Sequence, residues 1–376
     1  MDKNNWTYKK LGEVATIIGG STPKSNVEEY WGGNHYWVTP ADLNGNKYQG
    51  STPRTITDLA IQKTNLQLLP IGTVLLSSRA PIGKVAITTV PMYCNQGFKN
   101  IVCSELLNNE FVYWYLLGKT EYLNSLGRGA TFKEISKKTT EQIPIPIPPL
   151  AEQERIVAEL DLLSRIIDKK KAQLKELDQL AQSIFYTMFG DPITNEKGWE
   201  VKRLREVSKL INGRAYKQNE LLNEGKYKVL RVGNFFTNSN YYYSDLELEE
   251  NKYCDNGDLL FAWSASFGAF IWDGEKVIYH YHIWKVLYDE KQLNKIFYCN
   301  LLNTMTNAFM NDVHGIGMVH LTKQGMEDYI LPLPPLPLQQ EFASKIEAIE
   351  RQKSLIQQSI VETQTLFDSR MDHWFG

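Results

Sequence analysis

The 376-residue sequence lacks several features that would place it in a simple class of protein. Its apolar runs stay well below the ~18–20 residues that a membrane-spanning helix needs, and its polar start, MDKNNWTYKK, predicts no secretory signal peptide. The four cysteines are too scattered for a disulfide framework or a CxxC metal knuckle, so we expect reduced thiols in a cytoplasmic protein. A net charge of −2 excludes binding to nucleic acid by bulk charge alone.

Motifs for catalysis are also missing. The chain has no GxxxxGK[ST] phosphate loop, no GxSxG nucleophile elbow and no Asn/Asp-Pro-Pro-Tyr/Phe motif of the amino-methyltransferases. His280 and His282 would share one face of a strand, as two metal ligands can, but no third ligand is evident and a surface or interface pair is the favoured interpretation. We therefore expect a chain that is not an enzyme by itself and holds no metal or cofactor.

What the sequence does contain is an internal repeat. Four pairs of segments match in the same order and at nearly constant spacing: Trp6–Val14 with Trp199–Val207, Gly72–Leu76 with Gly257–Phe261, Ile143–Leu150 with Tyr329–Leu336, and Phe189-Gly190 with Phe375-Gly376. This pattern indicates a tandem duplication with a period of about 190 residues.

Each repeat begins with a block of short β-branched and aromatic runs separated by turn residues, which predicts a mixed α/β unit in which strands predominate. The predicted strands are Tyr36–Thr39, Thr73–Ser77, Lys84–Val90, Lys228–Val232, Leu259–Trp263 and Lys276–Tyr281, and the predicted helices are Leu106–Leu117 and Gln292–Ala308. A proline-rich bridge follows each block. An extended, stiff domain boundary is favoured over an SH3-type ligand, because the bridge lies between two structured elements.

A long helix follows each bridge, with apolar residues at heptad spacing and an interruption at Lys170. The expected coiled-coil seam is Ile156, Leu160, Leu163, Ile167, Leu174, Leu177 and Ile184 in the first helix, and Phe342, Ile346, Ile349, Ile356, Ile360 and Phe367 in the second. The fold class predicted is therefore α+β, with two similar strand-rich domains joined by an antiparallel helical pair around a pseudo-two-fold axis. The expected domains are residues 1–145 and 191–332, and the expected helices are residues 146–190 and 333–376.

Several motifs together resemble type I restriction–modification specificity subunits, and the resemblance extends over essentially the whole chain. The matching segments are Gly19–Ser25, Tyr30–Gly33, Trp37–Leu43, Gly72–Gly83, Asn95–Lys99 and Ile143–Ile156. The second half departs from the pattern, with Asn212–Lys217 and Trp263–Phe267 in place of two of these runs. Such divergence is what the family implies, because each half recognises a different half-site.

The resemblance implies a non-catalytic subunit with two target recognition domains that bind an asymmetric, two-part sequence in double-stranded DNA. It implies two modification (methyltransferase) subunits as partners, and it allows for restriction (ATPase and nuclease) subunits, with no membrane involved. The assembled complex would act as a DNA adenine methyltransferase and a type I site-specific endonuclease. S-adenosylmethionine, ATP and Mg²⁺ would enter through those other subunits.

A base-recognising loop needs side chains that form bidentate hydrogen bonds to base edges, supported by cations on phosphates. In the first half the candidates are Lys24, Ser25, Arg79, Gln96, Lys99, Arg128 and Lys133. In the second half they are Arg214, Tyr216, Lys217, Ser264, Ser266, His280, His282, Lys285, His320 and Lys323. Ordinary surface placement is the alternative for each of them. For the whole chain, the alternative is a coiled-coil scaffold that binds proteins without sequence-specific DNA binding.

Overall fold

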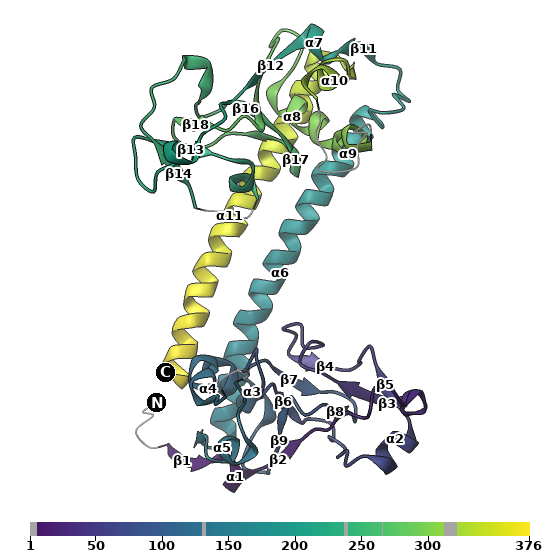
Figure 1. The fold of residues 1–376 in the computed structure, drawn as a ribbon, viewed down its shortest axis with the longest axis vertical. Helices are drawn as coiled ribbons and strands as arrows, with labels where there is room; N and C mark the ends of the chain where they lie inside the picture. The colour runs from purple at the N-terminus through teal and green to yellow at the C-terminus, as the bar shows by residue number, and fades with distance from the viewer. Residues whose placement is uncertain (1–5, 130–132, 237–239, 265, 312–321) are drawn as a thin grey trace. The chain divides into compact units, whose positions relative to one another are not determined.

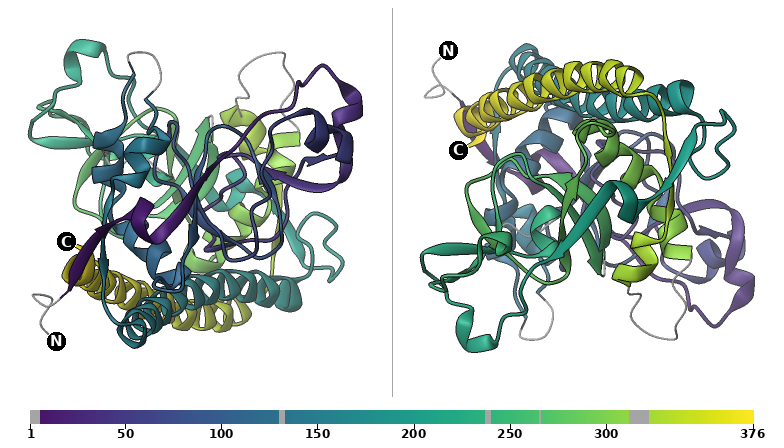
Figure 2. Two further views of the ribbon diagram at one scale, coloured as in Figure 1. Left: turned by 90° about the horizontal axis from the view of Figure 1, so that it is seen from below. Right: turned by 90° about the horizontal axis from the view of Figure 1, so that it is seen from above.

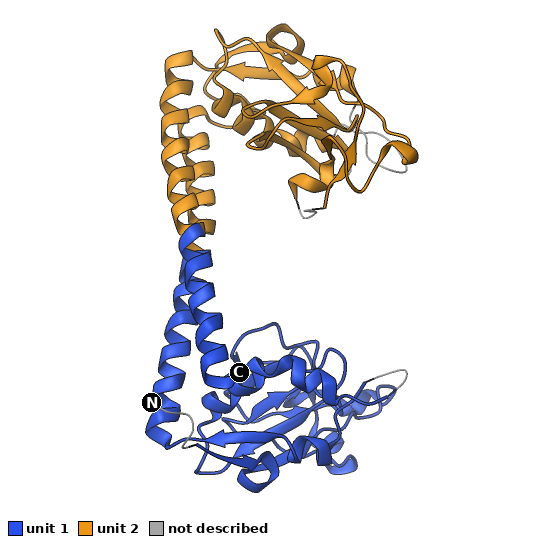
Figure 3. Cartoon of the chain, turned by 90° about the vertical axis from the view of Figure 1, so that its left-hand side faces the viewer, with its two compact units in different colours: residues 1–171, 358–376 blue, residues 172–357 orange. Residues whose placement is uncertain are grey.

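The computed structural model describes residues 6–129, 133–236, 240–264, 266–311 and 322–376. It divides the chain into two compact units (Figure 3). Unit 1 contains Met1–Lys171 and Gln358–Gly376, and unit 2 contains Ala172–Gln357, so each unit includes part of both long helices. None of the helices in the described residues combines the length and the hydropathy that are needed to cross a lipid bilayer.

Unit 1 is built on a five-stranded sheet in the order β2-β9-β6-β7-β4 (Figure 1). A three-stranded sheet, β5-β3-β8, contains the parallel pair β3–β8, and β1 pairs with β10 in an antiparallel ribbon. The strands are β1 (Thr7–Lys10), β2 (Ala15–Gly19), β3 (Trp31–Val38), β4 (Tyr48–Gln49), β5 (Thr55–Ile56), β6 (Val74–Leu76), β7 (Val85–Thr88), β8 (Tyr93–Cys94), β9 (Lys99–Cys103) and β10 (Pro144–Ile147).

Unit 2 repeats this plan. Its sheets have the orders β12-β19-β16-β17 and β14-β13-β18-β15, the pair β13–β18 is parallel, and β11 pairs with β20. The strands are β11 (Glu200–Arg203), β12 (Ser208–Asn212), β13 (Tyr227–Leu230), β14 (Tyr242–Ser244), β15 (Tyr253–Cys254), β16 (Leu259–Ser264), β17 (Ser266–Ile271), β18 (Val277–Tyr279), β19 (Ile283–Tyr288) and β20 (Ile330–Leu333).

The helices also occur in matching places. Unit 1 has α1 (Leu11–Val14), η2 (Glu28–Tyr30), α2 (Asp58–Lys63), α3 (Asn109–Gly118), α4 (Thr120–Leu126) and α5 (Lys137–Glu141). Unit 2 has α7 (Leu204–Val207), η3 (Gln218–Glu220), η4 (Val232–Phe235), η5 (Glu250–Lys252), α8 (Lys295–Thr304), α9 (Thr306–Asn311) and α10 (Lys323–Glu327). The long helices are α6 (Leu150–Phe189) and α11 (Leu336–Phe375).

The proline-rich bridges are strands rather than free linkers. Residues 144–147 form β10 and pair with β1, and residues 330–333 form β20 and pair with β11. A proline in such a ribbon costs little, because an edge strand needs hydrogen bonds on only one side. Each bridge is therefore part of its unit, which differs from the extended boundary that the composition suggests.

A buried glutamine fixes each long helix to its unit. Gln153 Oε1 accepts a hydrogen bond from the backbone N–H of Asn108 at 2.8 Å, and Gln339 Oε1 accepts one from Asn294 at 2.8 Å. Each glutamine Nε2 also donates to two backbone carbonyls, and both side chains are fully buried. Asn108 and Asn294 in turn cap α3 and α8, so the same latch occurs in both repeats.

The two long helices pack antiparallel within each unit, side by side in every view (Figure 2). In unit 1, Glu159 pairs with Arg370, and Lys170 Nζ donates to Ser359 Oγ at 2.6 Å. In unit 2, Lys353 Nζ lies 2.8 Å from Asp178. All thirteen predicted seam residues are buried or half-buried, and the lysines that interrupt the seam bind polar groups of the facing helix.

The ends of the long helices complete the two cores. Phe375 ends α11 and packs against Phe111 of unit 1, with ring centroids 5.5 Å apart. Phe189 ends α6 and packs against Phe297 of unit 2, with ring centroids 4.7 Å apart. The predicted fold class is confirmed: two similar, strand-rich α/β repeats are combined with an antiparallel pair of long helices.

Candidate nucleic-acid interface

In both units three chain segments meet, and we call this place the junction. They are the residues that follow β2 or β12, the end of β6 or β16, and the turn between β8 and β9 or between β18 and β19. In unit 1 the backbone N–H of Ser21, after β2, donates to Cys94 O at 3.0 Å, and that of Ser78, after β6, donates to Gly97 O at 2.8 Å. In unit 2 the corresponding bonds run from Arg214 to Tyr279 O at 3.0 Å and from Trp263 to His282 O at 3.1 Å. The same backbone frame therefore presents different side chains in the two repeats.

A glycine makes each junction possible. A Cβ added to Gly20 would lie 2.0 Å from Asn95 O, and one added to Gly213 would lie 2.3 Å from Tyr279 O. No other residue fits between these backbone segments without moving them. The match between Gly20 and Gly213 is visible in the sequence, although the sequence does not show what each glycine faces.

Charged side chains from three distant segments converge at the unit 1 junction. Glu134 Oε2 accepts a hydrogen bond from Arg79 Nε at 2.9 Å, and Glu134 Oε1 accepts one from Lys99 Nζ at 3.1 Å. Burial alone would raise the pKa of Glu134, but the hydrogen bonds from Lys99 and Arg79 outweigh it and lower that pKa. Glu134 is therefore a charged carboxylate that holds two of the predicted DNA-binding cations.

The remaining unit 1 candidates lie around this cluster. Arg128 exchanges two backbone hydrogen bonds with Glu134, at 3.1 and 3.0 Å, and Lys133 is exposed next to it. The side chain of Gln96, which is exposed, hydrogen-bonds Thr22. That bond ties the turn before β9 to the loop whose next residues, Lys24 and Ser25, are exposed. The seven candidates thus belong to one connected group of loops, whereas Lys99 is only 9% exposed.

The unit 2 junction begins with Arg214, both of whose Nη groups bind one carboxylate. Arg214 Nη1 and Nη2 donate to the two carboxylate oxygens of Glu220, at 2.9 and 2.8 Å. This pairing lowers the pKa of Glu220 to about 2, and the backbone N–H of Lys217 donates to the same carboxylate at 2.8 Å. The rings of Tyr216 and His280 stack beside Arg214 with centroids 6.3 Å apart.

The rest of this junction is mainly aromatic. Trp263 stacks on Trp284 with centroids 5.3 Å apart, and His282 meets the edge of Trp263 at 5.2 Å. Burial, with the nearby His282 and Arg231, lowers the pKa of His280 to about 4, so its imidazole is uncharged at neutral pH. A neutral imidazole offers one hydrogen-bond donor and one acceptor.

Two candidates of unit 2, Lys285 and Ser264, are used inside the unit, whereas Lys323 is exposed. Lys285 Nζ lies 2.6 Å from Asp258 Oδ2, so its ammonium is paired inside the unit. Ser264 is 2% exposed in the β16–β17 hairpin, while Ser266 is half-buried. Lys323 begins α10 and pairs with Glu327 at 3.5 Å. His320 lies outside the described residues.

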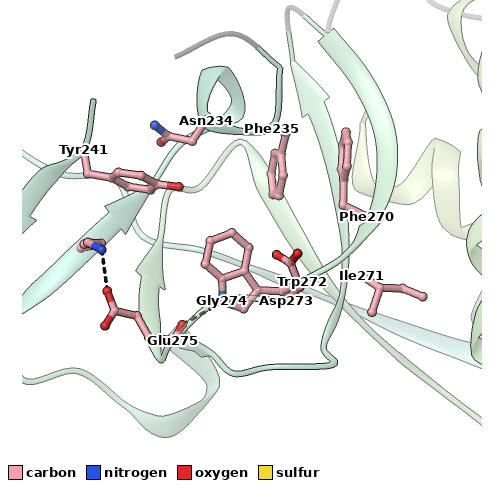
Figure 4. A pocket seen from close by; sticks show the side chains of 10 residues that line it. Asn234, Phe235, Tyr241, Phe270, Ile271, Trp272, Asp273, Gly274 and Glu275 are labelled. Carbon is pink, nitrogen blue, oxygen red and sulfur yellow. Dashed lines mark hydrogen bonds and ion pairs between the residues drawn. The ribbon is translucent and has the colours of Figure 1, made fainter. Parts of the chain in front are cut away.

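A separate pocket of about 650 Å³ opens in unit 2 beside β13 and β17 (Figure 4). Phe235 and Phe270 stack there with centroids 4.2 Å apart, Lys228 pairs with Glu275 at 2.6 Å, and Trp272 Nε1 donates to Glu275 O at 2.8 Å. Aromatic faces of this kind can stack an unpaired base or another flat ring. None of the described candidates lines this pocket, so it is distinct from the junction.

The sequence analysis missed the residues that organise each junction. Glu134, Glu220 and Trp263 are absent from the predicted set, yet they contact several of its members. One signal was available, because the repeat aligns Trp263 with Ser78 of the motif Ser-Ser-Arg-Ala-Pro. No local pattern marks Glu134, whose partners lie 35 and 55 residues away in the chain.

The chain is similar to known proteins over both repeats. A family model described as the type I restriction modification DNA specificity domain matches the chain twice, over residues 3–179 and 196–364. The type I restriction enzyme MjaIX specificity subunit of Methanocaldococcus jannaschii is 31% identical over 376 residues, covering 92% of this chain and 87% of that protein.

Solved structures agree on the fold. The S subunit of a type I restriction–modification system from M. genitalium gives a TM-score of 0.57 at 12% identity, covering 98% of this chain and 95% of that chain. A structure from work on complex assembly and conformational transition of the type I R-M system gives a TM-score of 0.65 at 19% identity, covering 98% and 97%.

Proposed function

Because the chain belongs to the family of type I restriction modification DNA specificity proteins, we propose that it recognises a two-part sequence in duplex DNA through its two junctions. The subunit is not itself catalytic. Each junction binds one half-site, and the half-sites differ because the side chains of the junctions differ. The observation that carries this proposal is one backbone frame, closed by Gly20 and Gly213, that occurs twice with unlike side chains.

The two junctions offer different binding chemistry. In unit 1, Arg79, Lys133 and Arg128 supply exposed cations, and Gln96 supplies an amide that can bond a base edge. In unit 2, Lys217 is the exposed cation, and Tyr216, His280 and His282 supply aromatic and neutral polar groups. Ser25 and Lys24 in unit 1, and Ser266 and Lys323 in unit 2, are further contacts in this proposal. Residues 1–145 and 191–332 are the proposed recognition domains.

The long helices, in residues 146–190 and 333–376, are the proposed docking surface for two modification subunits. Large apolar side chains on them stay exposed and point away from the seam: Leu162, Val361 and Leu366 in unit 1, and Leu180 and Leu355 in unit 2, each 47–68% exposed. S-adenosylmethionine would enter with the modification subunits, and ATP and Mg²⁺ with restriction subunits. Adenine methylation and DNA cleavage are activities of that assembly.

The test is a domain exchange in the assembled complex. Residues 20–140 are replaced by those of another family member, the chain is expressed with its modification partners, and the methylated motif is mapped across the host genome. One side of the two-part motif should change and the other should stay. A motif that changes on both sides, or on neither, would refute modular recognition.

A parallel binding measurement separates this function from a scaffold. The complex should prefer a duplex that carries its motif over a duplex of scrambled sequence by a factor of roughly 10³ or more. A complex that assembles but binds both duplexes equally would be a protein-interaction scaffold.

A further inference from the structure

We infer that Arg79 recognises a guanine in the half-site of unit 1, and that Glu134 and Lys99 are positioning residues that fix its guanidinium for this contact. The inference rests on the proposed function and names one base and the group that reads it. The geometry of the Arg79–Glu134–Lys99 cluster carries it.

The Arg79 guanidinium is held by one edge. Its Nε donates to Glu134 Oε2 at 2.9 Å, and its side chain is 44% exposed. Within the described part of the chain, neither of its Nη groups has a hydrogen-bond partner. The Nε bond fixes the plane of the guanidinium, and the Nη edge is left as a pair of parallel donors. Such a fork matches the O6 and N7 acceptors that guanine alone presents together in the major groove.

Glu134 is itself held in place by the buried Lys99. Lys99 Nζ donates to Glu134 Oε1 at 3.1 Å and to Ser78 Oγ at 3.2 Å, and Lys99 is only 9% exposed. A lysine buried in this way is a poor phosphate ligand, because little of it reaches the surface and two of its three donors are used inside the unit. The three side chains form a row from the buried Lys99 through Glu134 to the exposed Arg79.

The carboxylate also argues for a base rather than a phosphate. Glu134 places a negative charge next to the Arg79 guanidinium, which weakens the attraction of that guanidinium for a phosphate. A base edge is uncharged, so the strength of a contact with it depends on the direction of the hydrogen bonds rather than on charge. The row therefore favours selectivity over charge neutralisation.

Unit 2 supplies an internal contrast. Arg214 also sits at a junction, but both of its Nη groups bind Glu220, at 2.9 and 2.8 Å. The donor fork that remains open on Arg79 is closed on Arg214. Only the arginine of unit 1 is assigned to a guanine.

The test uses the full chain with its modification partners and duplexes that carry the mapped motif. Each guanine of the motif is replaced in turn by 7-deazaguanine, which lacks only the N7 acceptor. At one guanine this replacement should weaken wild-type binding about 2- to 12-fold, the square root of the 5- to 150-fold range of a complete bidentate contact, because the bond to O6 remains. Arg79→Ala should bind the normal motif with at least that loss and should no longer respond to 7-deazaguanine at that position.

Positioning by Glu134 has its own signature. Glu134→Gln keeps Arg79 but replaces its charged acceptor with a neutral amide oxygen, which holds the guanidinium less firmly. The response to 7-deazaguanine at the same position should therefore shrink, while binding to scrambled DNA stays equal or rises. A purely structural role would weaken binding to all duplexes alike. Arg79→Lys retains charge without the fork and should lose most of the response. Arg205→Lys, at an exposed arginine on α7 that also pairs with a carboxylate, Asp328, is the matched control and should keep the full response.

Three results would overturn the inference. The first is a motif whose unit 1 half-site, identified by the domain exchange, contains no required guanine on either strand. The second is an Arg79→Ala variant that melts like the wild type and still responds to every 7-deazaguanine as the wild type does. The third is an equal loss on motif and scrambled duplexes, which would make Arg79 a phosphate contact. The proposed function fails separately, if the wild-type complex does not prefer its motif.

Discussion

The two junctions share a backbone but differ in chemistry. In unit 1, Arg79 and Lys99 surround the carboxylate of Glu134. In unit 2, the positions that align with Ser78 and Lys99 are Trp263 and Trp284, which stack on each other. The difference shows that the duplicated fold conserves the frame that holds the loops together, while the side chains at its rim are free to diverge.

The elements that do not diverge have a common purpose. The glutamine latches, the asparagine caps of α3 and α8 and the terminal phenylalanines fix each long helix to its unit. These contacts hold the frame and do not face the junction. Variants of the shared elements should therefore act equally in both units, and variants of the junctions should act in one unit only.

The largest expected effect is on the helix ends. Phe375→Ala and Phe189→Ala each remove a ring that is 3% exposed, which should cost about 3–5 kcal/mol of unfolding free energy in the unit concerned. Denaturant unfolding combined with hydrogen exchange would assign the loss to unit 1 for Phe375 and to unit 2 for Phe189. Leu366→Ala and Leu180→Ala, on exposed side chains of the same helices, are the controls. If only one of the two phenylalanine variants lost unfolding free energy, the two helix ends would not have equivalent roles in the repeats.

The glutamine latches should give a smaller and again equal loss. Gln153→Ala or Gln339→Ala leaves one backbone N–H and two carbonyls without the glutamine, at about 1–3 kcal/mol for the unsatisfied groups. Chemical denaturation measures it, and the exposed Gln340→Ala should be close to neutral. If both latch variants were as stable as Gln340→Ala, the latches would have no role in attaching the helices.

Salt dependence should separate the two junctions. Lys133→Ala removes an exposed cation from unit 1 and should lower the slope of log affinity against log salt by about 1. Tyr281→Ala removes an exposed ring from unit 2 and should weaken binding with no change of slope. Titrations of the complex at several salt concentrations measure both. Equal slopes for the two variants would contradict a phosphate contact at Lys133 and an uncharged contact at Tyr281.

The smallest effect concerns pH. The pKa of His280 is lowered to about 4, whereas an unfolded histidine titrates near 6.5, so between these values the unfolded chain binds more protons. The stability that neutral His280 contributes is complete above pH 6.5 and declines as pH falls through this window towards 4. His280→Gln should reduce that decline by roughly 1 kcal/mol, about half of what the two pKa values imply, because solvent screens the part-exposed ring. Urea unfolding at pH 7.5 and 5 measures the decline. Asn95→Gln, at the aligned position of unit 1, should leave it unchanged.

Much of the fold could be predicted from the sequence, because the information was local or repeated. Short β-branched and aromatic runs bounded by turn residues predicted six strands, and all six are present, from β3 to β18. The heptad spacing predicted both long helices, and the repeat predicted that the units are alike. One helix predicted over residues 292–308 is instead divided into α8 and α9.

The remaining features depend on contacts between distant residues. The composition of the proline bridges predicts linkers, because their pairing partners, β1 and β11, lie more than 100 residues away in the chain and leave no local signal. The sequence predicts an exposed cation at Lys285, because its partner Asp258 is distant in the chain. The Glu134 cluster could not be predicted, because it forms only when the fold brings three distant segments together. Residue type indicated which side chains could bind DNA, and only the tertiary structure separated exposed cations from paired ones.

The most direct test of two independent junctions uses one matched pair of variants. Gln96 and Tyr281 occupy aligned positions in the two turns, and both side chains are exposed. Gln96→Ala removes one side-chain hydrogen bond, to Thr22, but both alanine variants keep the backbone bonds and the glycines that close the junctions. Each full chain is expressed with the proposed modification subunits, and the methylated motif is mapped across the host genome. Gln96→Ala should relax positions on one side of the two-part motif, and Tyr281→Ala should relax positions on the other side. Relaxation of the same side by both variants, or an unchanged motif in both, would contradict the account.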